Sequence, residues 1–424
     1  MIRSTFPFRR SVFAAACVAA LLTGCIHGRV APDALPASTG RLDAARLPQI
    51  DAAVNDAIAA RKLPGAVLLV EHDGAVYEQA YGKLSYEADA RAVATGTVFD
   101  AASLSKVLAT APSVLKLAEE GKIALDARLV DYFPECANGG KEGITIRHLL
   151  THSSGLPAGL PATPAWHGDA AAHALACRQE VTHPPGTFFR YSDINYILLG
   201  QLVQKASGMP LDAFARTRIF EPLRMIDTGY LPLRRLDSRA VALVAPTQEG
   251  TEGEASVHGD LAPGQLLQGV VHDPTARRMD GVAGSAGVFT TARDVARYAR
   301  MLLRGGELDG VRILSADSVR LLTTVQSPAG IQALRGLGMD IDSPYALRPR
   351  GTVFPVGSYG HTGFTGCVLW IDPGSRSFYV LLSNRVYPDD KSNVLALYTR
   401  LGTLAAEAAG LRAPPRSTGV ARMD

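Results

Sequence analysis

The chain has 424 residues, 47% of them hydrophobic and 20% charged, and this length exceeds what one typical core needs. We therefore expect one large domain with two lobes, or two domains. The 43 basic and 40 acidic residues give a net charge of +3 without a block of like charge, so the charge pattern offers no support for nucleic-acid binding.

The first residues have the pattern of a secretory signal. Three arginines within the first ten residues precede an apolar run over 12–22, which ends at Leu-Thr-Gly-Cys25. The run is too short to span a bilayer as a permanent helix. A cysteine in this place resembles the bacterial lipoprotein box, which implies removal of residues 1–24 and acylation of Cys25. The alternative is a plain signal peptide with an incidental cysteine.

The resemblance to a lipoprotein implies an exported protein that is anchored to the membrane by lipid. In a Gram-negative cell the anchor would lie in the outer membrane, facing the periplasm. Residues 25–40 are rich in Ala and Pro and are interpreted as a tether. The segment 413–424, with two prolines and a glycine, is predicted to be a mobile tail.

Between the tether and the tail, hydrophobic periodicity predicts two hairpins at the two ends of residues 41–412. The first follows a helix over 47–61 and has strands over 66–70 and 75–79 around Asp73-Gly74, a typical hairpin turn. The second has strands over 367–372 and 378–383. The intervening chain is mainly helical, with helices predicted over 104–120, 146–150, 194–206 and 292–303.

This order of elements predicts an α+β fold. One antiparallel sheet would be built from both termini and flanked by helices, with a mainly helical lobe inserted. Residues 41–412 would form a single domain with two lobes.

A candidate nucleophile lies just ahead of the predicted helix over 104–120, in Ser103-Leu-Ser-Lys106. Residues three apart share a helix face, so Ser103 and Lys106 can meet. A serine needs a neighbour that takes its proton, and a lysine whose pKa is lowered by burial can help. Ser-x-x-Lys occurs again at Ser113 and Lys116, inside the same helix, where we interpret it as structural. Taken alone, Ser103 could equally be a helix cap.

Two further stretches could meet this serine. Tyr191-Ser-Asp193 stands just before a helix, where the phenol could act as a general base while Asp193 caps the helix. Tyr-Gly-His361-Thr362-Gly-Phe364 places glycines around a His-Thr pair, which allows a substrate backbone to approach closely. The N–H of Phe364 could be an oxyanion donor beside the N–H of Ser103.

In combination these stretches resemble the S-x-x-K, Y-x-N and K-T-G elements of class C beta-lactamases and the related serine esterases, D-alanyl carboxypeptidases and penicillin-binding proteins. The segments 144–156 and 281–289 are similar to that family as well. The resemblance covers about residues 47–412. It implies a serine hydrolase with Ser103, Lys106 and Tyr191 as catalytic residues, and with Asp193, His361 and Thr362 in substrate binding or proton relay.

Two departures bear on the substrate. Asp193 stands where the lactamase pattern has Asn, and His361 stands where it has Lys, so less fixed positive charge faces a substrate carboxylate. An ester or a D-Ala-D-Ala peptide is therefore favoured over a beta-lactam. The alternatives are a beta-lactamase, or a catalytically weak lipoprotein that binds penicillin or peptidoglycan. The segment with His272 and Asp273 resembles lipoprotein and periplasmic members, or else forms a simple turn.

No cofactor is implied, and the histidines show no transition-metal ligand spacing. Of the five cysteines, Cys17 lies in the predicted signal and Cys25 would carry lipid. Cys136, Cys177 and Cys367 remain. We expect buried free thiols, with a disulfide between Cys136 and Cys177 as the alternative that an oxidising compartment would allow.

Overall fold

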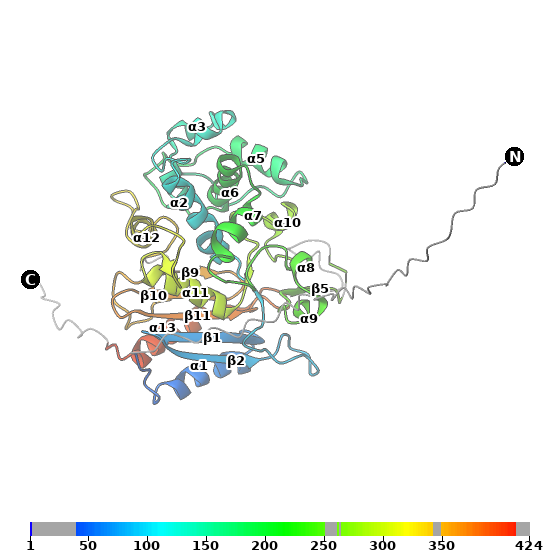
Figure 1. Cartoon of the computed structure of the whole chain (residues 1–424), viewed down its shortest axis with the longest axis vertical. Helices are drawn as coiled ribbons and strands as arrows, with labels where there is room; N and C mark the ends of the chain where they lie inside the picture. The colour runs from blue at the N-terminus through cyan, green and yellow to red at the C-terminus, as the bar shows by residue number, and fades with distance from the viewer. Residues whose placement is uncertain (2–39, 251–260, 263, 342–348, 413–424) are drawn as a thin grey trace, which may run out of the picture. The chain divides into compact units, whose positions relative to one another are not determined.

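The computed structural model describes residue 1 and residues 40–250, 261–262, 264–341 and 349–412 (Figure 1). Beyond Met1, these residues belong to one compact unit, Ala37–Asp424. The predicted signal peptide with its Cys25, all but the last residue of the tether, and the tail over 413–424 lie outside the described residues. Within the described part, no helix is both long and apolar enough to cross a membrane.

A five-stranded antiparallel sheet lies at the centre of the unit, in the order β2-β1-β11-β10-β9. Its strands are β1 (Gly65–His72), β2 (Ala75–Gly82), β9 (Tyr359–Gly363), β10 (Cys367–Asp372) and β11 (Ser377–Ser383). Because β1 pairs with β11, the two ends of the chain share one sheet, as the sequence predicted. The strand β9 forms one edge.

The remaining strands are two-residue pairs: β3 (Phe99–Asp100) with β6 (Phe289–Thr290), β4 (Gln248–Glu249) with β5 (Leu266–Leu267), and β7 (Glu307–Leu308) with β8 (Val311–Arg312). The α-helices are α1 (Leu47–Ala59), α2 (Ala111–Glu119), α3 (Leu129–Tyr132), α4 (Ile146–Leu150), α5 (Asp169–Arg178), α6 (Asp193–Ser207), α7 (Leu211–Ala215), α8 (Pro232–Arg235), α9 (Ser238–Val241), α10 (Pro274–Arg278), α11 (Ala292–Leu303), α12 (Ala316–Thr323) and α13 (Leu395–Ala408). Two π-helical turns, η1 (Lys106–Thr110) and η4 (Arg216–Phe220), and two 3₁₀ turns, η2 (Pro134–Cys136) and η3 (Lys141–Gly143), complete the unit.

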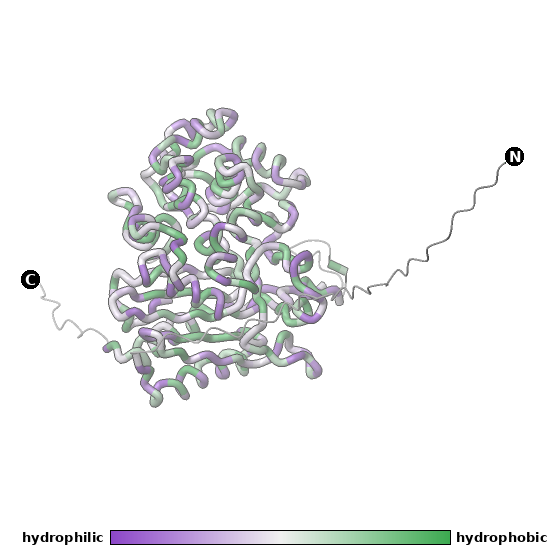
Figure 2. Tube along the Cα trace, in the orientation of Figure 1, coloured by the Kyte–Doolittle hydropathy of each residue, from purple (hydrophilic) through white to green (hydrophobic). Residues whose placement is uncertain are grey.

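The sheet is covered by helices on both faces. Helices α1 and α13 pack on one face, where alternate residues of β1 such as Leu68 and Val70 join Trp370 in one apolar cluster. The residues between them, such as Val67 and Leu69, face the other side and join the cluster of α2, α6 and α11. The strands of the sheet are largely coloured as hydrophobic in Figure 2. This alternation is the two-residue period of a strand that is buried on both sides.

The helical lobe, with α2, α5, α6 and α7, lies above the sheet in Figure 1. The observed architecture is therefore the α+β arrangement that the sequence predicted. The hairpin turn at Asp73-Gly74 has positive φ at both residues, +43° and +89°, as a type I′ turn requires. Helix α11 begins and ends at the predicted residues. Its start is fixed by Thr291, which caps the helix by accepting a hydrogen bond from the Asp294 N–H.

Candidate active site

Ser103 is held on a short segment between β3 and the turn η1. The Asp100 carboxylate accepts hydrogen bonds from the backbone N–H of Ala102 (2.8 Å) and of His272 (2.7 Å). Ala102 has a φ of +46°, a left-handed conformation that a residue with a side chain adopts only under strain. The fixed turn sets the direction in which Ser103 points.

Lys106 lies on the first helical turn after Ser103, as the three-residue spacing predicted. It is fully buried, and its Nζ donates to Ser103 Oγ (3.2 Å), to Asp193 Oδ1 (2.7 Å) and to the carbonyl oxygen of Ser285 (2.9 Å). The Ser285 contact comes from the segment 281–289, which was singled out in the sequence. Three acceptors thus surround one ammonium group, and the serine oxygen is one of them.

The charge state of Lys106 differs from the expectation that burial would make it a base. Burial lowers the pKa of Lys106, but the charge interactions with Asp193 and Tyr191 outweigh burial and hold that pKa above its ordinary value. The prediction of a lowered lysine pKa is therefore wrong, because it considered burial without the carboxylate 2.7 Å away. Lys106 is an ammonium ion that donates to Ser103, so it does not accept the serine proton in this state.

Tyr191 stands two residues before α6, as predicted, and its ring is packed by aromatic neighbours. The centroid of the His152 ring lies 4.4 Å from that of Tyr191, and Lys106 Nζ lies 4.9 Å from the Tyr191 centroid. The N–H of Ser192 donates to His152 Nδ1 (3.1 Å), and the N–H of Arg190 donates to the His152 carbonyl (3.0 Å). His152 therefore fixes the backbone on both sides of the tyrosine.

Asp193 is the first residue of α6, but its side chain does not cap that helix. The N-cap position belongs to Ser192, which makes no side-chain cap hydrogen bond, while Asp193 Oδ1 accepts from Lys106. Asp193 is not among the residues that line the cleft described below. The carboxylate is placed to neutralise Lys106, and its role in substrate binding or proton relay stays a prediction.

The His-Thr pair lies on β9, the strand at the edge of the sheet. The sequence predicted strands only over 367–372 and 378–383 in this region, whereas this stretch forms a strand of its own, paired with β10 from Tyr359 to Gly363. A side chain at position 363 would place its Cβ 2.4 Å from the carbonyl oxygen of Ala101. A glycine is required there, because the segment that carries Ser103 crosses the strand at this point.

Ser103, Tyr191, His361, Thr362 and Phe364 line one open cleft of about 370 Å³. Its walls are Ser103, Tyr191, Arg335, Asp340, His361, Thr362, Gly363, Phe364, Arg385, Asn393, Val394, Leu395 and Tyr398. Segments that lie as far apart in the sequence as Ser103 and Tyr398 therefore meet at this cleft. Lys106 lies behind the wall, in contact with the serine.

His361 is neutral at physiological pH. Burial, together with the positive charges of Arg335 and Lys106, holds the pKa of His361 well below its usual value. Its Nδ1 donates to the carbonyl oxygen of Thr362 (2.8 Å), because a carbonyl can only accept. The Nε2 atom therefore carries the lone pair, and the ring adds no positive charge to the cleft.

The sequence matches the family described as "Beta-lactamase" over residues 50–403. It is 32% identical over 345 residues to an Escherichia coli K12 protein named "Putative D-alanyl-D-alanine carboxypeptidase", covering 75% of this chain and 77% of that protein. It is 30% identical over 393 residues to the Bacillus subtilis "N-acetylmuramyl-L-alanine amidase", covering 86% and 88%. The chain belongs to the beta-lactamase family of serine hydrolases.

Solved structures agree on the fold of this beta-lactamase family member. A penicillin-binding protein homologue from Caulobacter crescentus superposes with a TM-score of 0.68 at 21% identity, over 87% of this chain and 99% of that one. At this identity the likeness concerns the fold alone. It supports the α+β architecture with the sheet built from both termini.

The segment around His272 and Asp273 supports the site of this family member without lining its cleft. Asp273 caps α10 by accepting from the Ala276 N–H (2.7 Å), which agrees with the interpretation of a turn. The His272 N–H holds Asp100, and the His272 ring lies 5.8 Å from that of Phe364. Asp100 and His152 are the supporting residues that sequence reasoning missed, although His152 lies within the family-like segment 144–156.

The second Ser-x-x-Lys is structural, as expected. Ser113 donates back to the carbonyl of Ala109 (2.6 Å) within α2, and Lys116 donates to the carbonyl of Ile313 (2.9 Å). Neither residue lines the cleft. The two copies of the motif differ because only Ser103 precedes the helix, at a turn that opens on the cleft.

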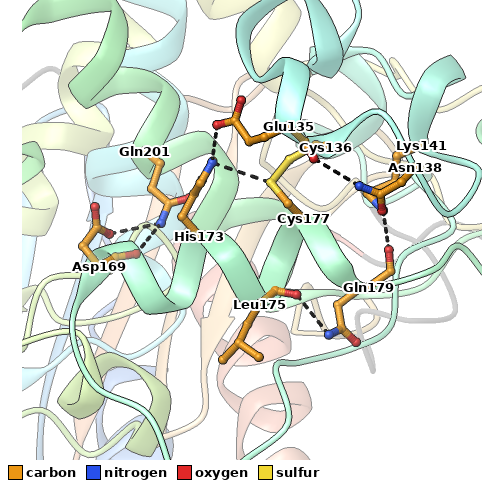
Figure 3. Close-up of a disulfide and its surroundings, with 10 residues drawn as sticks. All are labelled: Glu135, Cys136, Asn138, Lys141, Asp169, His173, Leu175, Cys177, Gln179 and Gln201. Atoms are coloured by element: carbon orange, nitrogen blue, oxygen red, sulfur yellow. Dashed lines mark hydrogen bonds and ion pairs between the residues drawn. A yellow bond between two sulfur atoms is a disulfide. The ribbon is translucent and has the colours of Figure 1, made fainter.

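Cys136 and Cys177 form a disulfide, so the expectation of free thiols is wrong for this pair (Figure 3). Cys367 is buried and free, as expected. His173 lies beside the disulfide, with Nε2 3.6 Å from Cys177 Sγ. Within the described ranges this Cys-His-Cys group is a candidate cation-binding cluster, but its two sulfurs are bonded to each other and are not thiolate ligands.

Proposed function

We propose that this chain is a D-alanyl-D-alanine carboxypeptidase that acts through an acyl-enzyme on Ser103. The observation that carries the proposal is the 3.2 Å contact between Lys106 Nζ and Ser103 Oγ at the floor of a cleft that Tyr191 and His361 also line. The Escherichia coli relative supports this substrate class by its name, whereas the name of the Bacillus subtilis relative refers to a different bond, the amide of N-acetylmuramyl-L-alanine.

In the first half-reaction, Ser103 Oγ attacks the carbonyl carbon of the penultimate D-Ala. Because Lys106 already donates to this oxygen, the serine proton must leave in another direction, and the Tyr191 phenolate is the base we assign to it. The proton passes from Tyr191 to the amine of the departing D-Ala as the C–N bond breaks. The ammonium of Lys106 stabilises the phenolate before Tyr191 takes the serine proton and after it has passed that proton to the amine.

A negative charge develops on the substrate carbonyl oxygen. We assign its stabilisation to hydrogen bonds from two backbone donors, the N–H groups of Ser103 and Phe364. The close approach of Ala101 to Gly363 supports this pairing, because it brings the two segments together. Water then attacks the ester carbonyl, Tyr191 takes the water proton, and Ser103 Oγ leaves with it. His361 and Thr362 orient the substrate along β9.

Replacement of Ser103 tests the proposal directly. The purified domain from residue 41 is incubated with a peptide ending in D-Ala-D-Ala, and free D-Ala is measured. Ser103→Ala is expected to reduce kcat by about three orders of magnitude or more, since the nucleophile cannot be replaced by a neighbour. Ser113→Ala removes the serine of the structural motif copy and is the matched control. A Ser103→Ala protein with undiminished D-Ala release would end the proposal.

A small or lipid-like ester is the second candidate, and the neutral His361 favours it. A K-T-G lysine would offer a fixed charge to a substrate carboxylate, whereas His361 offers none. The ratios of kcat/KM for an aryl ester, a D-Ala-D-Ala peptide and a chromogenic cephalosporin decide among the classes, and a beta-lactam is the substrate we rank last. Stable acylation by a fluorescent penicillin without turnover of any of the three would instead indicate a binding protein.

We also propose that the chain is exported and acylated on Cys25. The support is the basic start, the short apolar run and the Leu-Thr-Gly-Cys sequence. In cells fed an alkyne-tagged palmitate, the full chain is expected to acquire the label and Cys25→Ser is expected to lose it. Labelling of Cys25→Ser at the level of the unmodified sequence would contradict this assignment.

A further inference from the structure

A cluster of potential metal ligands lies in the helical lobe, outside the catalytic cleft. His173 and Glu135 stand beside the disulfide, and none of these residues lines the cleft (Figure 3). We propose that this cluster is a zinc site when the disulfide is reduced. The ligands are the two thiolates, the imidazole and the carboxylate of Cys136, Cys177, His173 and Glu135. The site is independent of the proposed acyl transfer at Ser103.

The ligand atoms are close enough to share one ion. The nitrogen and sulfur ligand atoms of Cys136, His173 and Cys177 all lie within 4.8 Å of one another. His173 and Cys177 are four residues apart on α5, and His173 Nε2 lies 3.6 Å from Cys177 Sγ. In a tetrahedral zinc site, bonds of about 2.3 Å to sulfur and about 2.0 Å to nitrogen place these two atoms about 3.5 Å apart. The observed spacing of nitrogen and sulfur therefore fits zinc.

Reduction of the disulfide supplies the two thiol ligands. A dithiol reductant becomes a disulfide while the bond between Cys136 and Cys177 becomes two thiols, so electrons and protons balance. The freed side chains rotate about their Cα–Cβ bonds, which lets the sulfurs separate without a change in the backbone. Zinc then displaces the two thiol protons, because the thiolate is the form that binds metal.

The His173 ring is oriented for metal binding through its other nitrogen. Gln201 donates from Nε2 to the carbonyl and the carboxylate of Asp169 (3.2 and 3.1 Å), so its Oε1 accepts from His173 Nδ1 (2.8 Å). This hydrogen bond fixes the proton on Nδ1 and leaves Nε2 as the ligand atom. The Phe133 ring packs against the imidazole, with the two centroids 4.8 Å apart. A histidine held by such an outer acceptor is typical of a metal ligand.

Glu135 supplies the fourth ligand. Its Oε1 lies 2.7 Å from His173 Nε2, and a metal ion bound to both atoms replaces the proton of that hydrogen bond. Hydrogen bonds from its own backbone N–H and from His173 lower the pKa of Glu135, so the carboxylate is ionised. Two thiolates and an imidazole select zinc over magnesium or calcium, which prefer oxygen ligands.

The disulfide and the zinc ion are thus alternative links between η2 and α5. Both close the segment between Cys136 and Cys177, which are 41 residues apart in the sequence. Every newly made chain passes through the thiol state, and in that state zinc closes the helical lobe. Oxidation by a disulfide reagent reverses the reaction and releases the ion.

The test uses the unit Ala37–Asp424, which contains every element of the fold and lacks Cys17 and Cys25. One sample is kept oxidised, and another is reduced with excess dithiol and desalted without oxygen. In equilibrium dialysis at neutral pH, each reduced chain is expected to bind one zinc ion with a dissociation constant of about 1 μM or lower. The oxidised sample is expected to bind none at this affinity. Cobalt is expected to show thiolate charge-transfer absorption in the reduced sample only.

Single variants separate this site from zinc held elsewhere on the surface. In the reduced unit, Cys177→Ser and His173→Ala are each expected to weaken zinc binding by about 100-fold or more, beyond the loss typical of an outer partner. Glu135→Gln is expected to weaken it by about tenfold, because water can replace a half-exposed ligand. Cys367→Ser and His167→Ala, at the buried free thiol and at an exposed histidine, are the matched controls with unchanged binding.

Urea unfolding shows whether the ion binds the folded chain. Zinc is expected to raise the midpoint of the reduced unit and to leave that of the oxidised unit unchanged, because an ion that binds only the folded state stabilises it. A reduced unit that binds no zinc, or binds it without a shift in midpoint, overturns the inference. Equal binding by the oxidised unit, or binding that survives in both Cys177→Ser and His173→Ala, overturns it as well. None of these results bears on the activity of Ser103.

Discussion

At the scale of single residues, the site depends on the charge that Asp193 maintains on Lys106. The two side chains are 2.7 Å apart, and Lys106 is fully buried. Burial lowers the lysine pKa, and Asp193→Asn removes the negative charge that opposes it most strongly. We expect the alkaline limb of the pH profile of kcat/KM to move to lower pH in Asp193→Asn. Exposed Asp317→Asn is the control, and an unmoved limb in Asp193→Asn would contradict the assigned role.

His152 has a positioning role that can be separated from a general effect on folding. Burial holds the pKa of His152 well below its usual value, so its Nδ1 accepts from the Ser192 N–H next to Tyr191. His152→Ala is expected to lower kcat by about 10- to 100-fold with little change in KM, as a small displacement of a catalytic group does. His152→Asn offers an amide oxygen near the same place and is expected to recover part of the loss. Equal kcat values for the two variants would argue against positioning.

At the scale of elements, helix α11 is joined to strand β1 by a buried ion pair. Arg300 donates to both oxygens of Glu71 at 2.6–3.1 Å, and the two side chains are 14% and 5% exposed. Arg300→Met leaves the Glu71 charge buried without its partner, which typically costs about 3–5 kcal/mol. Urea unfolding measures this loss of stability in Arg300→Met and in the double variant Glu71→Leu with Arg300→Met. The double variant is expected to regain most of the loss, and a loss that persists there would indicate packing as the cause.

Helix α11 also carries a carboxyl group that links stability to pH. Burial raises the pKa of Asp294 to about 7, whereas an aspartate in an unfolded chain titrates near 3.9. Between about pH 4 and pH 7 the folded state therefore holds a proton that the unfolded state has released, and the free energy of unfolding falls as pH rises. The contribution is at most roughly 4 kcal/mol over this interval.

Asp294→Asn is expected to flatten that slope, because its amide does not titrate and can still accept from Thr228, whose Oγ1 lies 2.8 Å from Asp294 Oδ2. Unfolding free energies at pH 4.5, 6 and 7.5 provide the measurement. The other raised carboxyl groups, including Asp100 with a pKa of about 6, remain in both proteins and cancel in the comparison. Parallel pH curves for the two proteins would refute the link.

Elements with a strong local period could be predicted from the sequence, and elements defined by distant contacts could not. Helix α11 and the hairpin of β1 and β2 follow from a cap, a turn and an apolar pattern that lie within a few residues of each other. The strand β9 is short, rich in glycine and polar, and its pairing with β10 and with the hairpin at Asp340 decides its structure. Arg335 gave no signal, and His152 was indicated only by its place in the family-like segment 144–156, because their roles arise where loops meet in space.

At the scale of the whole molecule, the helical lobe is closed by one covalent link remote from the cleft. The disulfide joins Cys136 of η2 to Cys177 of α5, which are 41 residues apart in the sequence. The sequence could not establish this bond, since two cysteines at that separation become neighbours only where α5 contacts the turn η2 in the fold. The bond agrees with the proposed export, because disulfides persist in oxidising compartments.

Loss of this bond is expected to lower stability without changing catalysis. A closed loop of this size restricts the unfolded chain by roughly 3–4 kcal/mol, so Cys136→Ser with Cys177→Ser should lower the free energy of unfolding by about that amount. Neither cysteine lines the cleft, and kcat/KM at 25 °C should stay within about twofold of the unmodified value, as for a change outside the site. Cys367→Ser, at the buried free thiol, separates loss of the bond from loss of a sulfur. A double variant as stable as the oxidised protein would show that the lobe is held by its core alone.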